Sequence, residues 1–554
     1  MRLLDRLLNG GIVCSLITVL LTGCGGGKEI SGVSDTGGDS LMAPEISFDA
    51  SSANPDLPSA FPVYGGGESP AVFATGGAQQ NNSNLVVIDG YSPNQNPVSA
   101  DPDAAATFPE FITAYNQLAI KLFNKFSTYE ENSSGNADER NVVLSPFTMA
   151  QVIGMVSSGA AGKTAEEFQN IYSRDIGVGR LNGWSLMMSQ QVANPDPKIF
   201  HSRNIVWGHT NYLFLPGYLD NLAGYYQASL SALNFTTLGS DYQAMVDSWI
   251  NKATNNQIAY IGHDNEPAKT RLIMTGAARL DARWDMPFDP EKTSSGLFQK
   301  LDNLQYRVPM LRSQGVYNSY QDDTVTIVEL PLAANKYSMV IFMPEGPLRT
   351  REFDMWLCNW RFNAEGVGEI VQDESCYRDV FQDQHYFAFK NSFLEKYQQL
   401  VDLMTPRSVE VKLPIFSIDS NNYSMVSFLQ ANGVYLALDK KQANFSGINS
   451  LGYTYLKDFR QSAVIRFNAQ GLNGASAAVA ANEATPDEPP WVWKIGVGGG
   501  WGLFASNDII FGTYPPLPDV VPDARPFLFV VRDTQTKAIL YIGSMVDPGG
   551  ILVN

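Results

Sequence analysis

The pattern of apolar and polar positions predicts that regular structure begins near Phe108. From there, apolar side chains recur every three or four residues, as on one face of an amphipathic helix. They are Phe111, Tyr115, Leu118, Leu122 and Phe126, with Ala119 and Phe123 widening the stripe. A second helix is predicted over residues 146–157. The first part of the folded region is therefore expected to be mainly helical.

Strand patterns dominate the later part of the chain. Residues 339–343 form a continuous apolar run, which is typical of a strand buried on both faces. Val409, Val411 and Leu413 alternate with polar residues, as in a half-buried strand. Residues 527–531 and 539–542 flank a polar stretch and predict a hairpin. Helices followed by strands predict an α+β domain with large mixed sheets.

The first 23 residues have the layout of a signal peptide. Arg2 and Arg6 precede an apolar run, residues 12–21, that is too short to span a bilayer as a mature helix. The run ends in Leu-Thr-Gly-Cys, which resembles the bacterial lipobox and implies that Cys24 is lipidated. An ordinary signal peptide with an incidental cysteine is the alternative. With Gly25 next, we expect an exported protein anchored to a bacterial membrane, at the outer membrane or cell surface rather than the inner membrane.

Residues 24–107 are rich in Gly, Ser, Asn and Pro, and they include two runs of three glycines. Such a composition buries too little apolar surface to offset the loss of chain entropy on folding. We therefore expect a flexible tether over residues 24–107 and a folded domain over residues 108–554.

Charge and cysteine content restrict the partners. The formal net charge is −18, from 56 acidic and 38 basic residues, which argues against a nucleic-acid partner.

Without the signal peptide and Cys24, the remaining cysteines are Cys358 and Cys376. An oxidising compartment favours a disulfide between them, although two free buried thiols are the alternative. Neither cysteine belongs to a metal-binding spacing, so we expect no metal.

Motifs of common enzyme classes are missing from the sequence. Its four histidines are His201, His209, His263 and His385, and none lies in an HExxH spacing. There is no GxSxG motif, and the cluster at residues 496–502 lacks the ending of a phosphate-binding loop. We therefore predict a protein that is not an enzyme and needs no cofactor.

A series of short segments, in one order along the chain, carries a family resemblance. They are Asn-Val-Val-Leu-Ser-Pro-Phe-Thr (141–148), Gly-Ala-Ala-Gly-Lys-Thr-Ala-Glu-Glu (159–167), Val-Lys-Leu-Pro-Ile-Phe (411–416), Asn-Phe-Ser-Gly-Ile (444–448) and Arg-Pro-Phe-Leu-Phe (525–529). Over about residues 108–549 the chain resembles the serpin family. This resemblance implies a large mixed central sheet, two further sheets, eight to nine helices and an exposed reactive loop at about 471–524. It also implies that Ser145 and Thr148 lie beneath the central sheet, in the region called the shutter.

The segment 467–481 resembles the hinge of the serpin reactive loop. The hinge residues implied are Gly471, Leu472, Asn473, Gly474, Ala475, Ser476, Ala477 and Ala478. As a strand, this segment has two faces of mostly small side chains and no charge before Glu483. It can therefore enter a sheet without burying an ion. Taken alone, the alanine run would instead predict a flexible linker or a short helix.

The resemblance implies a single-use inhibitor of serine endopeptidases and, in second place, of cysteine endopeptidases. Its cleaved loop would insert into the central sheet and trap the acyl-enzyme, and the molecule would act as a monomer. The alternative is a serpin-fold surface lipoprotein that binds or scaffolds without inhibiting. Ala469 replaces a usual acidic residue and Leu472 a small hydroxylated one, and these two departures favour the alternative. Two further residues depart from the family's pattern. Gln461 occupies a position where a buried histidine is common, and Gly276 replaces an asparagine in the region where the main sheet opens.

The reactive loop is unusually long, because Gly471 lies 55 positions before Pro526. The family's spacing places the cleaved bond near Ala484 or Thr485, whereas Lys494 would suit a trypsin-like enzyme. The choice between these sites stays open. The Trp- and Gly-rich stretch 491–501 predicts a hairpin that either docks a partner or packs on its own protein.

Overall fold

A computed structural model describes most of the folded region, all of it within the compact unit Gln79–Asn554. The described residues are 85–93, 102–127, 140–172, 178–193, 195–262, 266–301, 305–345, 349–353, 359–362, 368–371, 377–381, 383–450, 454–480, 496–498, 523–547, 549 and 551–552.

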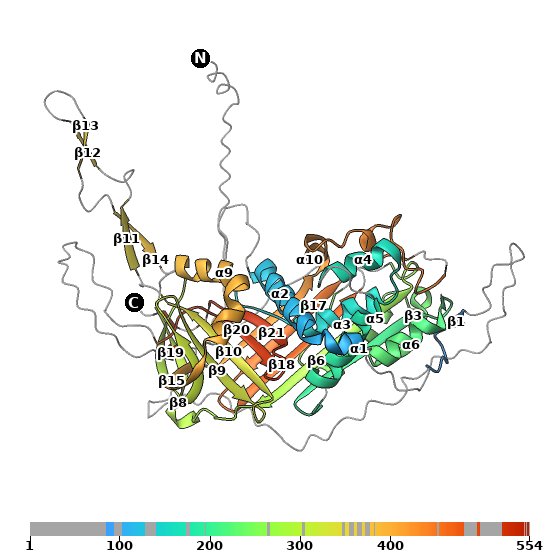
Figure 1. The fold of residues 1–554 in the computed structure, drawn as a ribbon, viewed down its shortest axis with the longest axis horizontal. Coiled ribbons are helices and arrows are strands. Elements are labelled where there is room, and N and C mark those ends of the chain that lie inside the picture. Colours follow the sequence, from blue (N-terminus) through green and yellow to red (C-terminus); the bar gives the residue numbers. More distant parts are fainter. Residues whose placement is uncertain are drawn as a thin grey trace, which may run out of the picture. The chain divides into compact units, whose positions relative to one another are not determined.

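Ten α-helices occur in the described part of the chain (Figure 1). They are α1 (Pro102–Ala106), α2 (Phe108–Ser127), α3 (Pro146–Ser157), α4 (Gly162–Asn170), α5 (Val178–Met187), α6 (Pro216–Tyr225), α7 (Phe235–Leu238), α8 (Asp241–Ala253), α9 (Asp383–Asp402) and α10 (Val426–Ala431). The helices predicted from Phe108 and over 146–157 are confirmed as α2 and α3. The total slightly exceeds the expected eight to nine because α1 and α7 are single short turns. Among the described residues, no helix is both long enough and apolar enough to cross a membrane.

The central sheet has six strands in the order β16-β17-β18-β6-β3-β5. Their bounds are β16 (Phe416–Ser424), β17 (Arg460–Phe467), β18 (Gly471–Ala480), β6 (Leu272–Arg283), β3 (Phe200–His209) and β5 (Ala228–Leu233). The pair β3–β5 is parallel and the other pairs are antiparallel. The predicted large mixed central sheet is therefore confirmed.

A second, ten-stranded sheet contains the apolar strands of the C-terminal half. Its strands are β19 (Gly496–Gly498), β15 (Thr405–Pro414), β8 (Gln305–Gln321), β9 (Val325–Leu332), β10 (Tyr337–Pro344), β20 (Phe527–Asp533), β21 (Ile539–Met545), β2 (Val142–Leu144), β7 (Ser294–Gln299) and β22 (Ile551–Leu552). The 17-residue strand β8 pairs with β7 near its start, with β15 along its middle and with β9 at its C-terminal end. It therefore connects β7, β15 and β19 to the strands that begin with β9. The predicted hairpin is β20–β21.

Three two-stranded ladders complete the described strands. They are β1 (Val86–Val87) with β4 (Leu213–Phe214), β11 (Arg349–Phe353) with β14 (Tyr377–Phe381), and β12 (Asn359–Phe362) with β13 (Gly368–Val371). Strand β1 and helix α1 lie within the segment predicted as a tether. Tyr91 donates a hydrogen bond of 2.9 Å to Asp220, which attaches this part of the segment to α6.

Helix α3 occupies the interior between the two sheets. All twelve of its residues are buried, and it packs against β6, β18 and β21. Helix α2 is fixed to the same region, because the Tyr115 hydroxyl donates to the Ile539 carbonyl at 2.5 Å and the Asn116 amide donates to the Lys537 carbonyl at 2.9 Å. The core beneath the central sheet is thus tied to the C-terminal hairpin.

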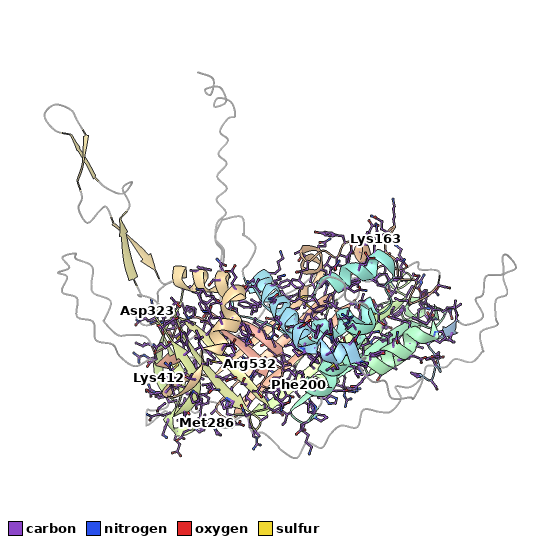
Figure 2. The ribbon with its side chains drawn as sticks, viewed as in Figure 1. Lys163, Phe200, Met286, Asp323, Lys412 and Arg532 are labelled. Atoms are coloured by element: carbon purple, nitrogen blue, oxygen red, sulfur yellow. The ribbon has the colours of Figure 1, made fainter. Side chains whose placement is uncertain are left out.

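A buried ion pair crosses the strands of the second sheet. The guanidinium of Arg532, which is labelled in Figure 2, donates to Glu329 at 2.6 Å. Ser338 and Asn318 donate to the same carboxylate at 2.7 and 3.0 Å. Burial alone would raise the pKa of Glu329, but Arg532 and these hydrogen bonds hold it below its usual value. Removing one partner would leave a buried charge without compensation.

We therefore expect Arg532→Met to lower the free energy of unfolding by about 3 kcal/mol, because Glu329 would stay charged or be forced to take up a proton. Urea denaturation followed by tryptophan fluorescence measures the change. Lys292→Met is the matched control, since it breaks the exposed ion pair with Asp289 and should cost about 1 kcal/mol or less. Equal losses for the two variants would contradict the prediction.

Candidate functional site

The predicted hinge residues all lie in β18, an interior strand of the central sheet. On one side, β18 pairs with β17 from Phe467↔Leu472 to Arg460↔Val479. On the other side, it pairs with β6 along its whole length, Gly471–Ala480. We call the space between β17 and β6 the slot. The chain is continuous through the residues that follow, so the segment fills the slot without having been cut.

The composition of β18 matches this buried position. Nine of its ten residues are buried, and the exception is Asn473, whose side-chain amide donates to Asp281 at 2.8 Å. Charged side chains are absent from β18. Inserting the strand therefore buries apolar and small groups without the desolvation penalty of an ion.

A tight turn leads from β17 into β18. The Asn468 side-chain oxygen accepts from the backbone N–H groups of Gln470 and Gly471 at 2.9 and 3.1 Å. Trp284, at the end of β6, donates its indole N–H to the Asn468 carbonyl at 2.9 Å and its backbone N–H to the Gln470 carbonyl at 3.0 Å. The turn is thus fixed by local hydrogen bonds and by the strand beside it.

Two glycines of β18 make close approaches that a side chain would obstruct. A Cβ at Gly471 would lie 2.2 Å from the Ala282 carbonyl oxygen, so a side chain here would displace backbone. A Cβ at Gly474 would lie 3.3 Å from the Tyr541 ring, which is tight but leaves room for a small shift. The glycine at 474 accommodates this ring.

The departures at Ala469 and Leu472 suit the inserted arrangement. Ala469 is 5% exposed, and its carbonyl accepts from the Phe288 N–H at 3.1 Å. Leu472 is 1% exposed and belongs to the main apolar core. An acidic residue at position 469 would be buried here, so the apolar replacement removes a desolvation cost from the inserted form.

The structure brings together the two predicted shutter residues and Gln461. Ser145 caps the start of α3: its hydroxyl accepts from the Thr148 N–H at 3.4 Å and donates to the Leu540 carbonyl at 3.0 Å. Gln461 of β17 donates to the Ser145 carbonyl at 2.7 Å and to the Thr148 hydroxyl at 3.1 Å. A neutral amide thus joins the central sheet to α3 at this point.

The missing side chain at Gly276 is compensated by the neighbouring strand. Asn204 of β3 lies opposite Gly276, and a Cβ at Gly276 would lie 3.0 Å from the Asn204 side-chain oxygen. The Asn204 amide donates to the Tyr226 carbonyl at 2.7 Å. An asparagine is therefore present beneath this part of the sheet, but on β3 instead of β6.

Helix α8 and the residues after it lie over the strands that border the slot. Helix α8 packs against β6, and Gln257, shortly after the helix, accepts from Arg466 of β17 at 3.0 Å. Asp247 of α8 accepts from the Ile261 N–H at 3.1 Å, and burial raises the pKa of this carboxyl to about 6. The chain after α8 thus reaches from β6 to β17, across β18.

Two histidines in the described part of the chain have structural surroundings. Burial, with help from Arg203 and Arg279, lowers the pKa of His201 to about 4, and its ring nitrogen accepts from Arg203 at 2.6 Å. The ring of His209 accepts from the Asn211 N–H at 3.1 Å. The other ring nitrogen of His209 lies 3.4 Å from the Thr236 hydroxyl, so both nitrogens of this ring have hydrogen-bond partners. Among the described residues, no three His, Cys, Asp or Glu side chains cluster as metal ligands would.

Several predicted sites lie outside the described residues. They are Cys24, Cys358, Cys376, Ala484, Thr485 and Lys494. Within the predicted Trp- and Gly-rich hairpin, the described strand β19 pairs with the edge of β15, from Glu410↔Gly498 to Lys412↔Gly496. This part of the long loop therefore extends the second sheet by one strand.

The sequence analysis placed Asn468 in the hinge-like segment without giving it a role, and it did not identify Trp284 or Tyr541 as neighbours of the hinge. The turn-forming Asn468 three residues before Gly471 was a usable signal, since asparagine side chains commonly bond the backbone two residues on. Nothing in the pattern around Trp284 or Tyr541 indicated which strand they would meet.

Comparisons with known proteins agree on one family. The family profile described as Serpin (serine protease inhibitor) matches residues 113–371 and 382–548. Iripin-8 of Ixodes ricinus is 23% identical over 414 residues, which cover 74% of this chain and 88% of that protein. Leukocyte elastase inhibitor of Xenopus laevis is 22% identical over 79% of this chain and 99% of its own length.

Solved structures of the same family show the same fold. The thermophilic serpin tengpin in its latent state has a TM-score of 0.58 at 17% identity, covering 82% of this chain and all of that one. Cleaved serpin 42Da has a TM-score of 0.57 at 17% identity, covering 79% of this chain and 98% of its own. Tengpin in its native state has a TM-score of 0.57 at 18% identity, covering 84% and 99%.

The buried position of Ala477 predicts the effect of a charge in the slot. Ala477 is fully buried between Ser462 and Ala277, so Ala477→Arg would bury an unpaired cation and expel β18. We expect a broad-specificity protease to cut within 471–480 at least tenfold faster than in the wild type, as mapped by mass spectrometry. Asn473→Arg is the control, because that position is half-exposed beside Asp281. Equal cleavage rates in all three proteins would refute buried insertion.

Proposed function

Because the chain belongs to the serpin family, we propose that it inhibits serine endopeptidases, and in second place cysteine endopeptidases, by inserting its own loop. One observation carries this proposal. The ten-residue strand β18 pairs along both edges within the central sheet and has no charged side chain. Its presence in the slot is the end state that such an inhibitor needs.

The proposed mechanism takes its chemistry from the target enzyme. The nucleophilic hydroxyl or thiol of the protease attacks the carbonyl of one loop peptide bond. It forms an acyl-enzyme and releases the loop's C-terminal part as an amine. In a molecule whose slot is still empty, the freed segment then enters the slot and carries the attached enzyme along the sheet. Distortion of the enzyme's active site prevents water from hydrolysing the ester. The inhibitor itself supplies the peptide bond and the free energy of insertion.

Pairing of β18 supplies a large part of that free energy. An interior ten-residue strand adds on the order of ten ladder hydrogen bonds, and each contributes about 0.5–1.5 kcal/mol net. Burial of Leu472 and Val479 adds to this sum, since both are 1% exposed. The total is comparable with the whole stability of an ordinary domain, which is about 5–15 kcal/mol.

A second candidate function is binding without inhibition, as a surface lipoprotein with a serpin fold. The observation that favours it is that β18 fills the slot in an uncut chain. The 15 residues 481–495 separate Ala480 from β19, which pairs with the edge of β15, and can extend by roughly 50 Å. Such slack would leave a bound protease far from the sheet.

Incubation with proteases separates the two candidates. We expect the soluble domain, residues 79–554, to form a covalent adduct with an elastase-, trypsin- or subtilisin-type enzyme, and this adduct should survive denaturing gel electrophoresis. Mass spectrometry of the released C-terminal peptide would identify the cleaved bond. With Ala477→Arg, the same enzyme should cut the loop and leave as free enzyme. Cleavage of the wild type without any adduct would support the binding function instead.

We further propose that the protein is a monomer held at a bacterial membrane by lipid on Cys24. The charged start, the short apolar run and the Leu-Thr-Gly-Cys ending support this proposal. Expressed in a bacterial host with its own leader, the wild type should fractionate with membranes, and Cys24→Ser should appear in the soluble periplasmic fraction. Recovery of both proteins in the soluble fraction would rule out the anchor.

A further inference from the structure

Two arginines and a histidine are neighbours on the face of the central sheet that points away from α3. In the ladder between β3 and β6, His201 is directly opposite Arg279. Gly276 faces α3, because a Cβ there would lie 3.0 Å from a valine side chain of that helix. Side chains alternate between the two faces of a strand, so Arg279 and the opposite His201 lie on the other face. Arg203, two residues after His201 on β3, shares that face.

One hydrogen bond within this cluster leaves several donors without a partner. The Arg203 Nε–H donates to Nε2 of His201 at 2.6 Å, so this ring nitrogen is an acceptor. The proton of the neutral ring is therefore on Nδ1. In the described part of the chain, no acceptor bonds the terminal Nη groups of Arg203, the Arg279 guanidinium or the His201 Nδ1–H. All three side chains are half-buried, so their donors are only partly hydrated.

The charges of the cluster repel one another. Burial lowers the pKa of Arg203, and the charge of Arg279 lowers it further. Burial, together with the same two guanidiniums, lowers the pKa of His201 to about 4, so its ring is neutral at pH 7. Among the described residues, no carboxylate forms an ion pair with either arginine. Asp281, two residues after Arg279 on the same strand, accepts instead from the Asn473 amide at 2.8 Å.

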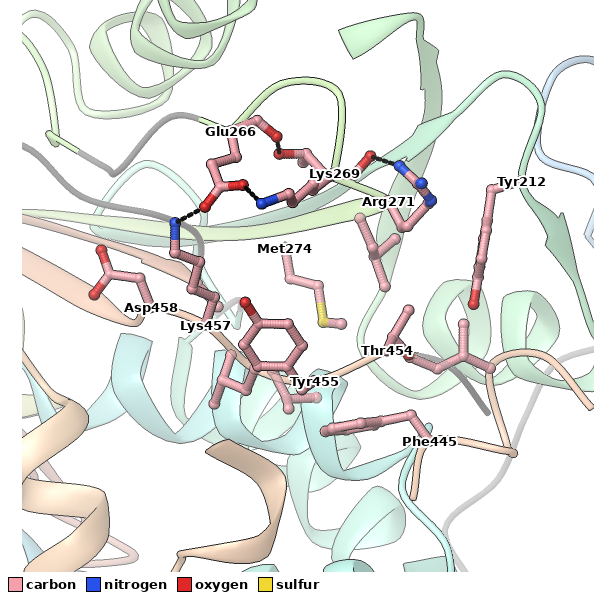
Figure 3. A pocket seen from close by; sticks show the side chains of 16 residues that line it. Tyr212, Glu266, Lys269, Arg271, Met274, Phe445, Thr454, Tyr455, Lys457 and Asp458 are labelled. Carbon is pink, nitrogen blue, oxygen red and sulfur yellow. Dashed lines mark hydrogen bonds and ion pairs between the residues drawn. The ribbon is translucent and has the colours of Figure 1, made fainter. Parts of the chain in front are cut away.

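Cations around a pocket at the end of β18 are arranged differently (Figure 3). This pocket has a volume of about 280 Å³, and on its rim Lys269 and Lys457 both contact the carboxylate of Glu266. Arg271, beside them, donates to two backbone carbonyls at 2.9 and 3.1 Å. Acidic side chains are abundant in this chain, whose formal net charge is −18. The cluster on β3 and β6 therefore lacks a compensation that the pocket rim has.

We propose that Arg203, Arg279 and His201 bind a phosphate-type oxyanion that bridges β3 and β6. Guanidinium groups offer paired N–H donors that match the spacing of phosphate oxygens, and the imidazole N–H adds a donor between them. Arg203 and Arg279 are diagonal neighbours in the ladder, which places them about 7 Å apart, within reach of one ligand for side chains of this length. A bound anion would replace the repulsion between the two arginines by attraction to a shared charge.

The filled slot does not supply the missing acceptor. On the other side of β6, Arg279 is directly opposite Ala475 of β18, whose side chain is a methyl group. The insertion of β18 therefore leaves the charge of the cluster uncompensated. The anion site is consequently independent of the proposed inhibition, and each can fail without the other.

Calorimetric titration with inorganic phosphate, at constant ionic strength, tests the proposal. We expect the wild type to show one saturable site. Arg203→Gln and Arg279→Gln should each weaken binding about tenfold or more, because each removes hydrogen bonds to a charged group. Arg283→Gln is the matched control, since Arg283 is an exposed arginine four residues further along β6, and it should leave the affinity unchanged.

The imidazole signals in NMR spectra give a second measurement on the folded protein. The chain has four histidines, and His201→Gln identifies the signal of His201. Phosphate should shift this signal and leave that of His209 in place. In Arg279→Gln without phosphate, the pKa of His201 should rise above about 4, because one of the two cations that lower it is gone. This rise also shows that the variant keeps the fold around the site.

Vesicles distinguish two sources of the phosphate group. Vesicles of phosphatidylcholine and phosphatidic acid in equal amounts present phosphate on a lipid, and the chain with Cys24→Ser is added to them. Binding that inorganic phosphate displaces and Arg203→Gln abolishes would identify a lipid head group as the ligand. Binding of inorganic phosphate without any binding to vesicles would identify a soluble anion, and either result supports the site. Absence of a phosphate response in both calorimetry and NMR, or equal affinity in the wild type and both arginine variants, would overturn the proposal.

Discussion

The pairing of one segment with two neighbours at once is the constraint on which the rest of this structure depends. Strand β18 satisfies backbone hydrogen bonds of both β17 and β6, and without it the central sheet would have two interior edges with unpaired groups. The neutrality of the segment, the close approach at Gly471 and the turn at Asn468 all serve this pairing. The residue types of β18 are therefore determined more by its pairing within the central sheet than by its membership of the loop.

The region beneath the sheet is built from neutral groups. Gln461, Ser145 and Thr148 connect β17 to α3 through uncharged hydrogen bonds, and Asn204 fills the space beside Gly276. Such bonds can form and break without the desolvation of an ion. Under the proposed function the sheet opens and closes above α3, and contacts of this kind suit that motion, because buried ions would hold the sheet in one arrangement. The buried pair Arg532–Glu329 lies instead in the second sheet, between the buried strands β20 and β9.

Local sequence patterns predicted much of the fold, whereas they predicted only part of the candidate site. The helix from Phe108, the helix over 146–157 and the β20–β21 hairpin have strong periodicity and were predicted directly. The burial of Ala469 was not, because it depends on strands far away in sequence. The position of Asn204 opposite Gly276 is likewise visible only when strand register is known. Pairing between distant residues leaves no periodic signal.

The chain segment after β18 makes the proposed inhibitory activity depend on the age of the molecule. Residues 481–495 link β18 to β19, which pairs with β15, and no bond along this link has to break for β18 to fill the slot. If a newly folded molecule starts with the slot empty, its conversion to the filled form competes with every encounter it makes. The reactive fraction of a population would then fall with age, at a rate set by the barrier to opening the sheet. Old and fresh samples of identical composition would differ in activity.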